Sequence, residues 1–345
     1  MSAAAAQRGQ VIDNHRMNST PLNQGHSTRP VAQRRAELAQ KVRSGTWVSA
    51  PGVFEMISAK MADRMGFDAL YMTGYGTVAS YLGLPDAGLA SYTDMVQRVA
   101  QFATITQTPL ICDGDTGYGG LLNVMHTVRG YERAGASAIQ LEDQEFPKKC
   151  GHMLGRRVID AQDMVAKIQV AVQTREDPNF LIIARTDART TLGLDEALRR
   201  AQLYAQAGAD VLFVESPESE AEMRQICAEL NVPCLANMVE GGRTPVKSKA
   251  ALQEIGYRMA IFPVTALLAS ACAGVTCAVE DPAPPSPPCA RARHWWPRWT
   301  HAQRARSRQG SIPHPQSVCP EPPPRTARSC PALKAPCGQW QAAPP

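Results

Sequence analysis

Two stretches of the chain, ERAGASAIQLED at 132–143 and AQAGADVLFVES at 205–216, present the same features in the same order. Each ends a helical pattern at Ala-Gly-Ala and continues into a short apolar run that stops at an acidic residue. A glycine just after a helical pattern is typical of a helix end, and an unbroken apolar run is typical of a strand buried on both faces. The two stretches therefore predict a helix-to-strand unit that the chain uses more than once.

The same alternation extends in both directions from these stretches. Helical segments such as 161–173, for which Asp160 is a suitable N-cap, and 195–208, which ends at Gly208, separate eight apolar runs. Eight alternations over about 230 residues predict a (β/α)8 TIM-type barrel. A doubly wound open sheet is the alternative, but no GxGxxG follows the first run. The runs are TWVSAPG (46–52), ALYMT (69–73), PLICDGD (109–115), AIQLED (138–143), FLIIARTD (180–187), VLFVES (211–216), PCLAN (233–237) and RMAIF (258–262).

The composition divides the chain into unlike regions. The formal net charge is +5, but residues 276–345 alone carry +6, which leaves −1 for residues 1–275. The basic character that would favour a nucleic-acid partner thus belongs to the end of the chain and not to the predicted barrel. We expect a disordered leader at 1–33, a barrel at 34–275 and a disordered Pro/Arg-rich tail at 276–345.

The tail holds 16 of the 27 prolines, which exclude a long helix there. Its mixture of Arg, Pro, Ala, Cys and Trp is typical of GC-rich coding sequence read out of frame, so we expect a frameshifted terminus; a genuine disordered extension is the alternative. Trp295, Trp296 and Trp299 among arginines leave nucleic-acid binding open as a rival, although we expect no nucleic-acid partner.

The chain has no apolar run of the ~18–20 residues that a membrane-spanning helix needs. The first residues lack a secretory hydrophobic segment, and the five cysteines of the barrel region show no CxxC spacing. These features predict a cytoplasmic protein with reduced thiols and no membrane contact. Arg8, Arg16 and Arg29 against one acid leave an organelle transit peptide open.

Carboxylates gather where the predicted strands end. Asp113 and Asp115 lie two residues apart at the end of the third run, so on a regular strand they would face the same side. Glu142 ends the fourth run, and Asp86 lies in GLPDAG. Aspartates that cap turns are the alternative for either aspartate alone, but hard oxygen ligands that converge on one barrel mouth predict a Mg²⁺ site, with Mn²⁺ as a second possibility.

The loop after the fourth run reads Lys148-Lys149-Cys150-Gly151-His152. A thiol beside lysines and a histidine has an electropositive setting, which lowers its pKa and suits it to acid–base or nucleophilic chemistry. An exposed basic loop with an incidental cysteine is the alternative. A loop of this kind over a barrel mouth is also typical of a closing lid.

Six motifs in this order resemble the isocitrate lyase/phosphoenolpyruvate mutase superfamily: DGDTGYGG, AIQLEDQ, PKKCGHMLGRRV, ARTDART, LFVES and ANMVEGGRTP. The resemblance covers residues 34 to 270 and is greatest to the branch of 2,3-dimethylmalate lyase, oxaloacetate hydrolase and petal death protein. The cysteine of the KKCGH loop is typical of the lyases and not of the phosphonate mutases. Methylisocitrate lyases usually have a histidine where this chain has Gln140, which counts against that activity.

The resemblance implies Mg²⁺-dependent retro-Claisen cleavage of a 2-hydroxy dicarboxylate, either a substituted malate or oxaloacetate. The products would be a 2-oxo acid and a second carboxylic acid. Two alternatives stay open within the superfamily, a phosphonate mutase or hydrolase and a methylisocitrate lyase. A folded but catalytically inactive protein is a further alternative because of the aberrant C-terminal region.

The resemblance also implies roles for individual residues. Cys150 would protonate the departing carbanion, and Lys148 and His152 would tune it. Arg185 would bind a carboxylate or oxyanion and Glu215 would orient it, although a structural ion pair with Asp187 or Glu215 is the alternative for Arg185. Asp113 would bind Mg²⁺ directly, with Asp86, Asp115 and Glu142 acting through water. The substrate-binding residues would be Tyr71, Thr73, Gly74, Tyr75, Gly151, Asn237, Glu240 and Thr244.

The family further implies a homotetramer with swapped C-terminal helices. This chain begins the corresponding helix with VTALLASACAGV (264–275) and then departs from the family pattern. We therefore expect the helix outside the last strand and the exchanged segment to be missing, which puts the tetramer in question.

Overall fold

The structure is a computed structural model that describes residues 29–151, 153 and 155–279. The expected leader up to residue 28, the expected catalytic residue His152 and the expected tail from residue 280 lie outside the described residues. The domain boundaries at residues 33 and 275 stay predictions. The first described helix begins at Val31 and the last ends at Val279.

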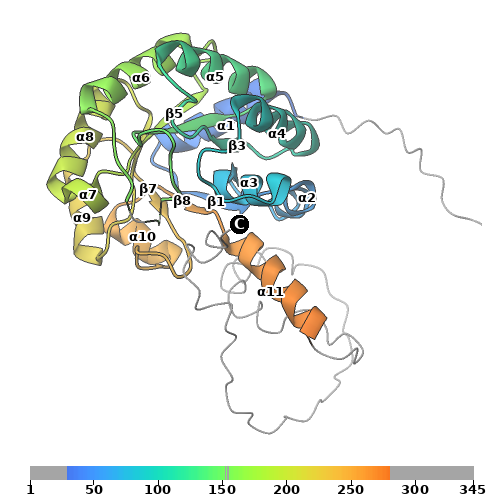
Figure 1. Cartoon of the computed structure of the whole chain (residues 1–345). Helices are drawn as coiled ribbons and strands as arrows, with labels where there is room; N and C mark the ends of the chain where they lie inside the picture. The colour runs from blue at the N-terminus through green and yellow to red at the C-terminus, as the bar shows by residue number, and fades with distance from the viewer. Residues whose placement is uncertain (1–28, 152, 154, 280–345) are drawn as a thin grey trace, which may run out of the picture.

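Eight parallel strands form a barrel (Figure 1). They run in the order β6-β5-β4-β3-β2-β1-β8-β7, and a parallel bridge between Leu212 of β6 and Cys234 next to β7 joins the two ends of this order. The predicted barrel is therefore confirmed and the open sheet is excluded, with one strand in each of the eight predicted runs. The strands are β1 (Val48–Val53), β2 (Leu70–Met72), β3 (Leu110–Asp113), β4 (Ala138–Glu142), β5 (Leu181–Thr186), β6 (Val211–Val214), β7 (Leu235–Asn237) and β8 (Met259–Phe262).

Helices surround the barrel on its outer face (Figure 1). The two stretches with the shared pattern form the predicted unit, because Gly135 and Gly208 both have φ near +102° just after α5 and α8 and lead into β4 and β6. The Asp160 carboxylate accepts the Gln162 N–H and caps α6. The helices are α1 (Val31–Arg43), α2 (Met56–Asp63), α3 (Gly74–Leu82), α4 (Tyr92–Ile105), α5 (Leu121–Ala134), α6 (Ala161–Thr174), α7 (Arg189–Leu192), α8 (Leu194–Gln206), α9 (Glu220–Glu229), α10 (Lys249–Ile255) and α11 (Thr265–Val279).

The barrel interior is filled by strand side chains, among them Ile111, Ile183 and Phe213. Leu38 and Val42 of α1 belong to the same buried cluster, so α1 closes the barrel at one end. A second cluster packs the outer faces of the strands against the helices. Because the interior is packed and not hollow, a ligand can enter only at the end where the loops after the strands meet.

The structure confirms the expectation that the chain begins a helix after the last strand. The helix α11 forms, and it extends four residues past the expected boundary at 275 because the first proline of the tail is Pro282. Figure 1 shows it projecting away from the barrel. Across the described part of the chain, none of the helices combines the length and the apolar character needed to cross a bilayer.

Candidate active site

Residues from seven strand ends and two loops line a pocket at the C-terminal end of the barrel. Cys150 and Gly151 enter it from the loop after β4, and Arg185 enters it from β5. Most of the residues that the sequence predicted for the site line this pocket together. The lining residues are Tyr71, Thr73, Tyr75, Asp86, Asp113, Glu142, Lys148, Lys149, Cys150, Gly151, Arg185, Phe213, Glu215, Asn237, Val239, Ile261, Pro263 and Val264.

One half of the site is an acidic cluster made of Asp86, Asp113, Asp115 and Lys148. The Lys148 ammonium lies 2.5 Å from Asp86 Oδ1 and 2.7 Å from Asp115 Oδ1, and all three side chains are buried. A Cβ atom on Gly74 would lie 2.6 Å from Asp113 Oδ2 and 3.5 Å from Asp115 Oδ1, so these two carboxylates converge beside the Gly74 backbone. The Lys148 ammonium thus pairs with two of the three aspartates, and the third, Asp113, lies beside Asp115.

The conformation of Asp115 differs from the expectation of a regular strand. The strand β3 ends at Asp113, and Asp115 has φ +48°, a left-handed conformation that a non-glycine residue adopts at a cost of about 1–3 kcal/mol. The Asp115 N–H donates to Asp113 Oδ1 at 3.1 Å, and the Tyr131 hydroxyl donates to the Asp113 carbonyl at 3.2 Å. The two carboxylates meet because this turn is held in place, not because strand alternation aligns them.

Burial dominates the electrostatics of the acidic cluster. Removal from water raises the pKa of Asp115 to about 7, although the Lys148 ammonium opposes the shift. For Lys148, burial acts to lower the pKa, but Asp115 and Asp86 outweigh it and the pKa is raised well above its ordinary value. Lys148 therefore stays charged, and its charge is committed to the aspartates. The structure places it against the predicted metal ligands, where the sequence had assigned it to tuning Cys150.

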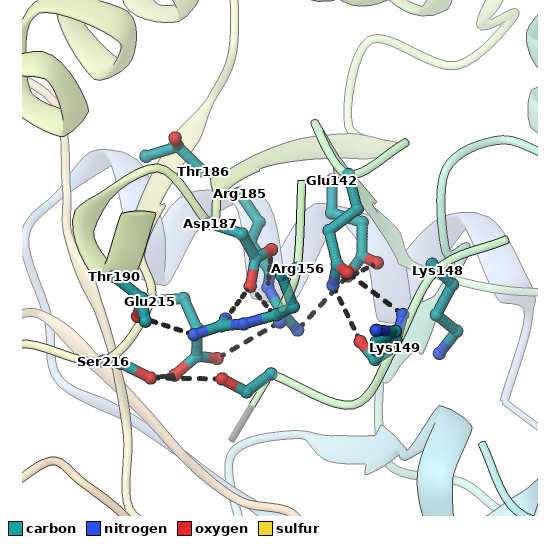
Figure 2. Close-up of polar contacts among 12 residues, drawn as sticks. Glu142, Lys148, Lys149, Arg156, Arg185, Thr186, Asp187, Thr190, Glu215 and Ser216 are labelled. Atoms are coloured by element: carbon teal, nitrogen blue, oxygen red, sulfur yellow. Dashed lines mark hydrogen bonds and ion pairs between the residues drawn. The ribbon is translucent and has the colours of Figure 1, made fainter. Parts of the chain in front are cut away.

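The other half of the site is an arginine cluster, which contains Arg185, Glu142, Asp187, Glu215 and Arg156 (Figure 2). Arg185 donates to both oxygens of Asp187, from Nε at 2.9 Å and from Nη2 at 2.8 Å. Its Nη1 lies 3.3 Å from Glu142 Oε2, and its Nη2 lies 3.5 Å from Glu215 Oε2. The alternative of a structural ion pair for Arg185 is thus present in the structure, and Arg185 lines the pocket as well.

The carboxylate of Asp143, which follows β4, accepts hydrogen bonds from the strand end that carries Asp187. It accepts the Asp187 backbone N–H at 2.8 Å and the Thr186 hydroxyl at 2.7 Å. The Tyr204 hydroxyl donates to it at 2.8 Å, and Arg200 lies 3.2 Å away. Burial raises the pKa of Glu142 well above its ordinary value, while Arg185 opposes the shift. A buried carboxylate is costly without donors, and this network supplies them to Asp143.

The backbone of the loop after β4 lies directly on the Arg185 guanidinium. A Cβ atom on Gly151 would collide with Arg185 Nη2 and would lie 3.0 Å from Glu215 Oε2. The Ser216 hydroxyl hydrogen-bonds to the Gly151 carbonyl at 3.3 Å (Figure 2). Cys150 is 8% exposed in this arrangement. The loop therefore brings the thiol and the guanidinium into one pocket, as the sequence predicted.

The predicted substrate-binding residues differ in how they lie. Tyr71, Thr73 and Tyr75 line the pocket, but the Gly74 N–H, which we expected to face the substrate, donates to Asp113 Oδ2 at 3.3 Å. The hydroxyl of Tyr71 donates to Gln140 Oε1 at 3.2 Å. Gly74 thus supports a predicted metal ligand instead of meeting the pocket.

The three residues expected to hold the distal carboxylate are not all in the pocket. Asn237 lines it and donates from Nδ2 to Glu215 Oε2 at 3.0 Å. Glu240 and Thr244 are absent from the lining, and Glu240 accepts the Thr265 hydroxyl at the start of α11. In the described part of the chain, Asn237 Oδ1, Glu240 Oε2 and Thr244 Oγ1 are buried without a hydrogen-bond partner. Each of these three oxygens could therefore still form a hydrogen bond, although among the three residues only Asn237 lines the pocket.

Sequence reasoning missed the apolar wall of the pocket and the buried arginine that faces Asp187. Phe213, Val239, Ile261 and Val264 line one side of the pocket. They look like ordinary strand and loop residues, so only their position at the strand ends could have identified them. Arg156 lies in the quoted motif PKKCGHMLGRRV, next to a second arginine, and no local pattern distinguishes the buried one.

The acidic cluster can be tested for its fit to a divalent cation. In residues 29–151, 153 and 155–279, no three His, Cys, Asp or Glu side chains lie close enough to hold a metal ion between them. The donor set nevertheless fits Mg²⁺, which binds through one or two carboxylates and keeps several waters. A buried ammonium already lies between Asp86 and Asp115, so the site is built for positive charge. Asp113 with water-bridged neighbours suits the ion better than a closed cage of carboxylates.

Comparison with known proteins places this site in context. A family model described as phosphoenolpyruvate phosphomutase matches residues 38–281. The 2,3-dimethylmalate lyase of Eubacterium barkeri is 51% identical over 232 residues, which cover 67% of this chain and 80% of that protein. A 2-methylisocitrate lyase of Aeropyrum pernix is 45% identical, with 68% and 75% covered.

Solved structures agree with these relatives. An oxaloacetate acetylhydrolase in complex with the inhibitor 3,3-difluorooxalacetate superposes with a TM-score of 0.70 and 32% identity, covering 80% of this chain and 95% of that one. A phosphonopyruvate hydrolase in complex with oxalate and Mg²⁺ superposes with a TM-score of 0.63 and 30% identity, covering 71% and 85%. Both similarities extend over the barrel that carries the site.

Proposed function

The chain belongs to the phosphoenolpyruvate mutase/isocitrate lyase superfamily, and from this membership we propose that it is a Mg²⁺-dependent lyase of 2-hydroxy dicarboxylates. Its named relatives are carbon–carbon lyases, and the chain is an enzyme of this type. The observation that carries the proposal is that Asp113, Cys150 and Arg185 line one pocket. The reaction yields a 2-oxo acid and a second carboxylic acid.

The two halves of the pocket suit the two ends of such a substrate. A guanidinium group recognises a carboxylate or a developing oxyanion, and Arg185 is already oriented by Asp187. The apolar wall at Phe213 and Val239 suits a carbon substituent on the substrate, which favours a substituted malate over unsubstituted oxaloacetate. The Asn237 amide, tied to Glu215, would hold the distal carboxylate.

Asp113 would hold Mg²⁺ directly, and Asp86, Asp115 and Glu142 would hold it through water. When bound, the ion supplies Lewis-acid polarisation of the substrate's 2-oxygen and its neighbouring carboxylate. The Tyr131 hydroxyl fixes the Asp113 backbone, and the Gly74 N–H fixes its carboxylate, so the predicted ligand is held in place before the substrate arrives. Lys148 compensates part of the negative charge of the cluster.

Cleavage requires a proton for the carbon that leaves. The 2-hydroxyl gives its proton to a carboxylate of the pocket, a role that we assign to Glu142, and becomes a carbonyl as the bond between C2 and C3 breaks. The electron pair stays on C3 beside its carboxylate, and C3 then takes up a proton. We assign the donor of that proton to the Cys150 thiol, since it lines the pocket next to the Gly151 backbone that contacts Arg185. The low exposure of Cys150 keeps bulk water from competing for the carbanion.

A substrate panel with and without EDTA tests the proposal. The purified full chain is assayed with 2,3-dimethylmalate, oxaloacetate, methylisocitrate, isocitrate and phosphonopyruvate in the presence of Mg²⁺, and products are identified by mass spectrometry. We expect cleavage of one dicarboxylate that stops with EDTA and falls about 10²–10⁴-fold in Cys150→Ser, as for loss of a general acid. Turnover of the phosphonate alone, or cleavage that persists in EDTA, would contradict the proposal.

A further inference from the structure

Arg156 is a buried arginine with no role in the proposed reaction so far. Its Nη1 donates to Asp187 Oδ1 and its Nη2 donates to the Thr190 hydroxyl at 2.6 Å (Figure 2). Its Nε donates to the Met153 carbonyl at 3.1 Å. The side chains of Arg156 and Asp187 are both fully buried. Each nitrogen of its guanidinium therefore has an acceptor, which is the arrangement of a side chain held in one orientation.

These contacts join two parts of the active site that are far apart in sequence. Arg156 lies six residues after Cys150 in the loop that follows β4, while Asp187 follows β5 and Thr190 lies in α7. The Met153 carbonyl belongs to the same loop as Arg156. Arg156 thus ties the loop that carries the proposed proton donor to the strand end that carries Arg185.

The shared carboxylate also connects Arg156 with the guanidinium in the pocket. Asp187 Oδ1 accepts from both arginines, and the bonds from Arg185 to Asp187 are shorter than its distances of 3.3 and 3.5 Å to Glu142 and Glu215. The orientation of Arg185 is therefore set by Asp187. Without Arg156, a single guanidinium group would pair with three buried carboxylates, and Asp187 would be left with one guanidinium partner in place of two.

We propose that Arg156 is a positioning residue, which uses the shared carboxylate of Asp187 to hold both the Cys150 loop and the Arg185 guanidinium in their working arrangement. The catalytic part of this inference rests on the proposed function of Cys150 and Arg185. Arg156 itself does not line the pocket, so it acts through these residues and not on the substrate.

The neighbouring residue offers a matched control. Arg157 is exposed, and its Nε lies 2.7 Å from Glu145 Oε2 at the surface. We compare Arg156→Met, Arg156→Lys and Arg157→Met in the full chain. The first readout is the rate at which iodoacetamide alkylates Cys150, followed by mass spectrometry of the peptide that contains it. The second is kcat and KM with Mg²⁺ and the dicarboxylate cleaved by the wild type, together with the melting temperature.

Arg156→Met is expected to speed alkylation of Cys150 about tenfold, because loss of a buried anchor opens the loop. Its kcat should fall about 10²-fold, as for an approximately 1 Å misplacement of catalytic groups. Arg156→Lys should restore the melting temperature but only part of kcat, since an ammonium cannot reproduce the planar fork that spans Asp187, Thr190 and Met153. Arg157→Met should match the wild type in every measurement.

Three results would decide against the inference or separate it from the proposed function. Wild-type alkylation and kcat in Arg156→Met would overturn it. A lower melting temperature with unchanged kcat per folded enzyme and unchanged alkylation would also overturn it, because Arg156 would then be structural only. A wild type that cleaves no dicarboxylate would contradict the proposed function, while faster alkylation in Arg156→Met alone would still support the loop anchor.

Discussion

The acidic cluster contains three aspartates and one ammonium group, which pairs with Asp86 and Asp115, whereas the arginine cluster contains three carboxylates and two guanidinium groups. The acidic cluster therefore keeps a larger excess of negative charge than the arginine cluster, although both are buried. An excess of buried carboxylates is costly unless a cation compensates it, so the first half suits a divalent ion. The second half has a smaller excess of negative charge, and Asp187 holds the Arg185 guanidinium in one orientation, which suits an anionic group of the proposed substrate.

The two halves also differ in what holds them. The acidic cluster is held by backbone N–H donors and by the left-handed turn at Asp115. The arginine cluster is held by side chains, among them Arg156 from the loop after β4 and Thr190 from α7. Changes to the first half should therefore act on metal dependence, and changes to the second half should act on substrate orientation. Four substitutions test this contrast.

The largest effect is expected from Asp113→Ala, which removes the proposed direct metal ligand. Loss of the ligand should lower Mg²⁺-dependent kcat/KM by at least about 10³-fold, or ~4 kcal/mol of transition-state stabilisation. It should also remove any rise in melting temperature that Mg²⁺ causes in the wild type. Asp163→Ala, an exposed aspartate of α6, serves as the control. Retained activity in Asp113→Ala would place the metal elsewhere.

The next effect is expected from Lys148→Met, measured by denaturation without Mg²⁺. Removing one partner of a buried ion pair should cost about 3 kcal/mol. Burial already raises the pKa of Asp115 to about 7, so the folded state binds its proton more tightly than the unfolded state. Stability then falls as pH rises from about 4 to 7, and the loss in Lys148→Met should be greater at pH 8 than at pH 6.

Mg²⁺ should recover part of the stability lost in Lys148→Met, because the ion supplies the missing positive charge. Lys149→Met is the matched control, since the Lys149 ammonium donates to the Gly155 carbonyl and not to the aspartates. If the two variants denatured alike, the acidic cluster would not depend on Lys148 for compensation.

Gly151→Ala is expected to disturb the arginine cluster without touching the acidic one. The added Cβ would collide with Arg185 Nη2, so the guanidinium or the loop must move, and kcat/KM should fall about 10²-fold. The apparent affinity for Mg²⁺ should stay at the wild-type value. Gly120→Ala, where an added Cβ has no atom within 4 Å, should be neutral. A weakened metal affinity in Gly151→Ala would show that the two halves are not independent.

The smallest effect is expected from Tyr131→Phe, which removes the hydroxyl that donates to the Asp113 carbonyl. One buried hydrogen bond contributes about 0.5–1.5 kcal/mol, and the Tyr118 hydroxyl also loses its partner. Denaturation should show this loss, and Mg²⁺ affinity should weaken severalfold or less. Tyr81→Phe at a partly exposed position gives the baseline. An affinity equal to that baseline would mean that the Asp113 turn holds without Tyr131.

Much of the site followed from the rule that parallel strands in a barrel end at one mouth. Asp113, Glu142, Arg185 and Glu215 lie within the last three residues of four of the predicted runs, and the structure brings all four into the pocket. The same rule could not place Asp115, because a left-handed turn follows β3 where a regular strand was assumed.

Loop residues were harder to predict, because no periodicity governs them. Cys150 and Gly151 enter the pocket as expected, but Glu240 and Thr244 of the EGGRTP loop do not line it. The side-chain direction of such residues depends on what the loop packs against. Glu240, for example, accepts a hydrogen bond from the Thr265 hydroxyl at the start of α11.

The barrel, its eight strands and the end at which the polar strand termini gather were all predictable from the sequence. These features follow from local properties, namely apolar runs, glycine helix ends and the covalent order of the chain. The pairing of the charged side chains could not be predicted and became visible in the tertiary structure. The structure placed Lys148 between Asp86 and Asp115 and buried Arg156, but not Arg157, against Asp187. The strength of an ion pair depends on the distance between the two groups and on their burial. The fold sets both, because it brings together residues that are 31 or 62 positions apart in the chain.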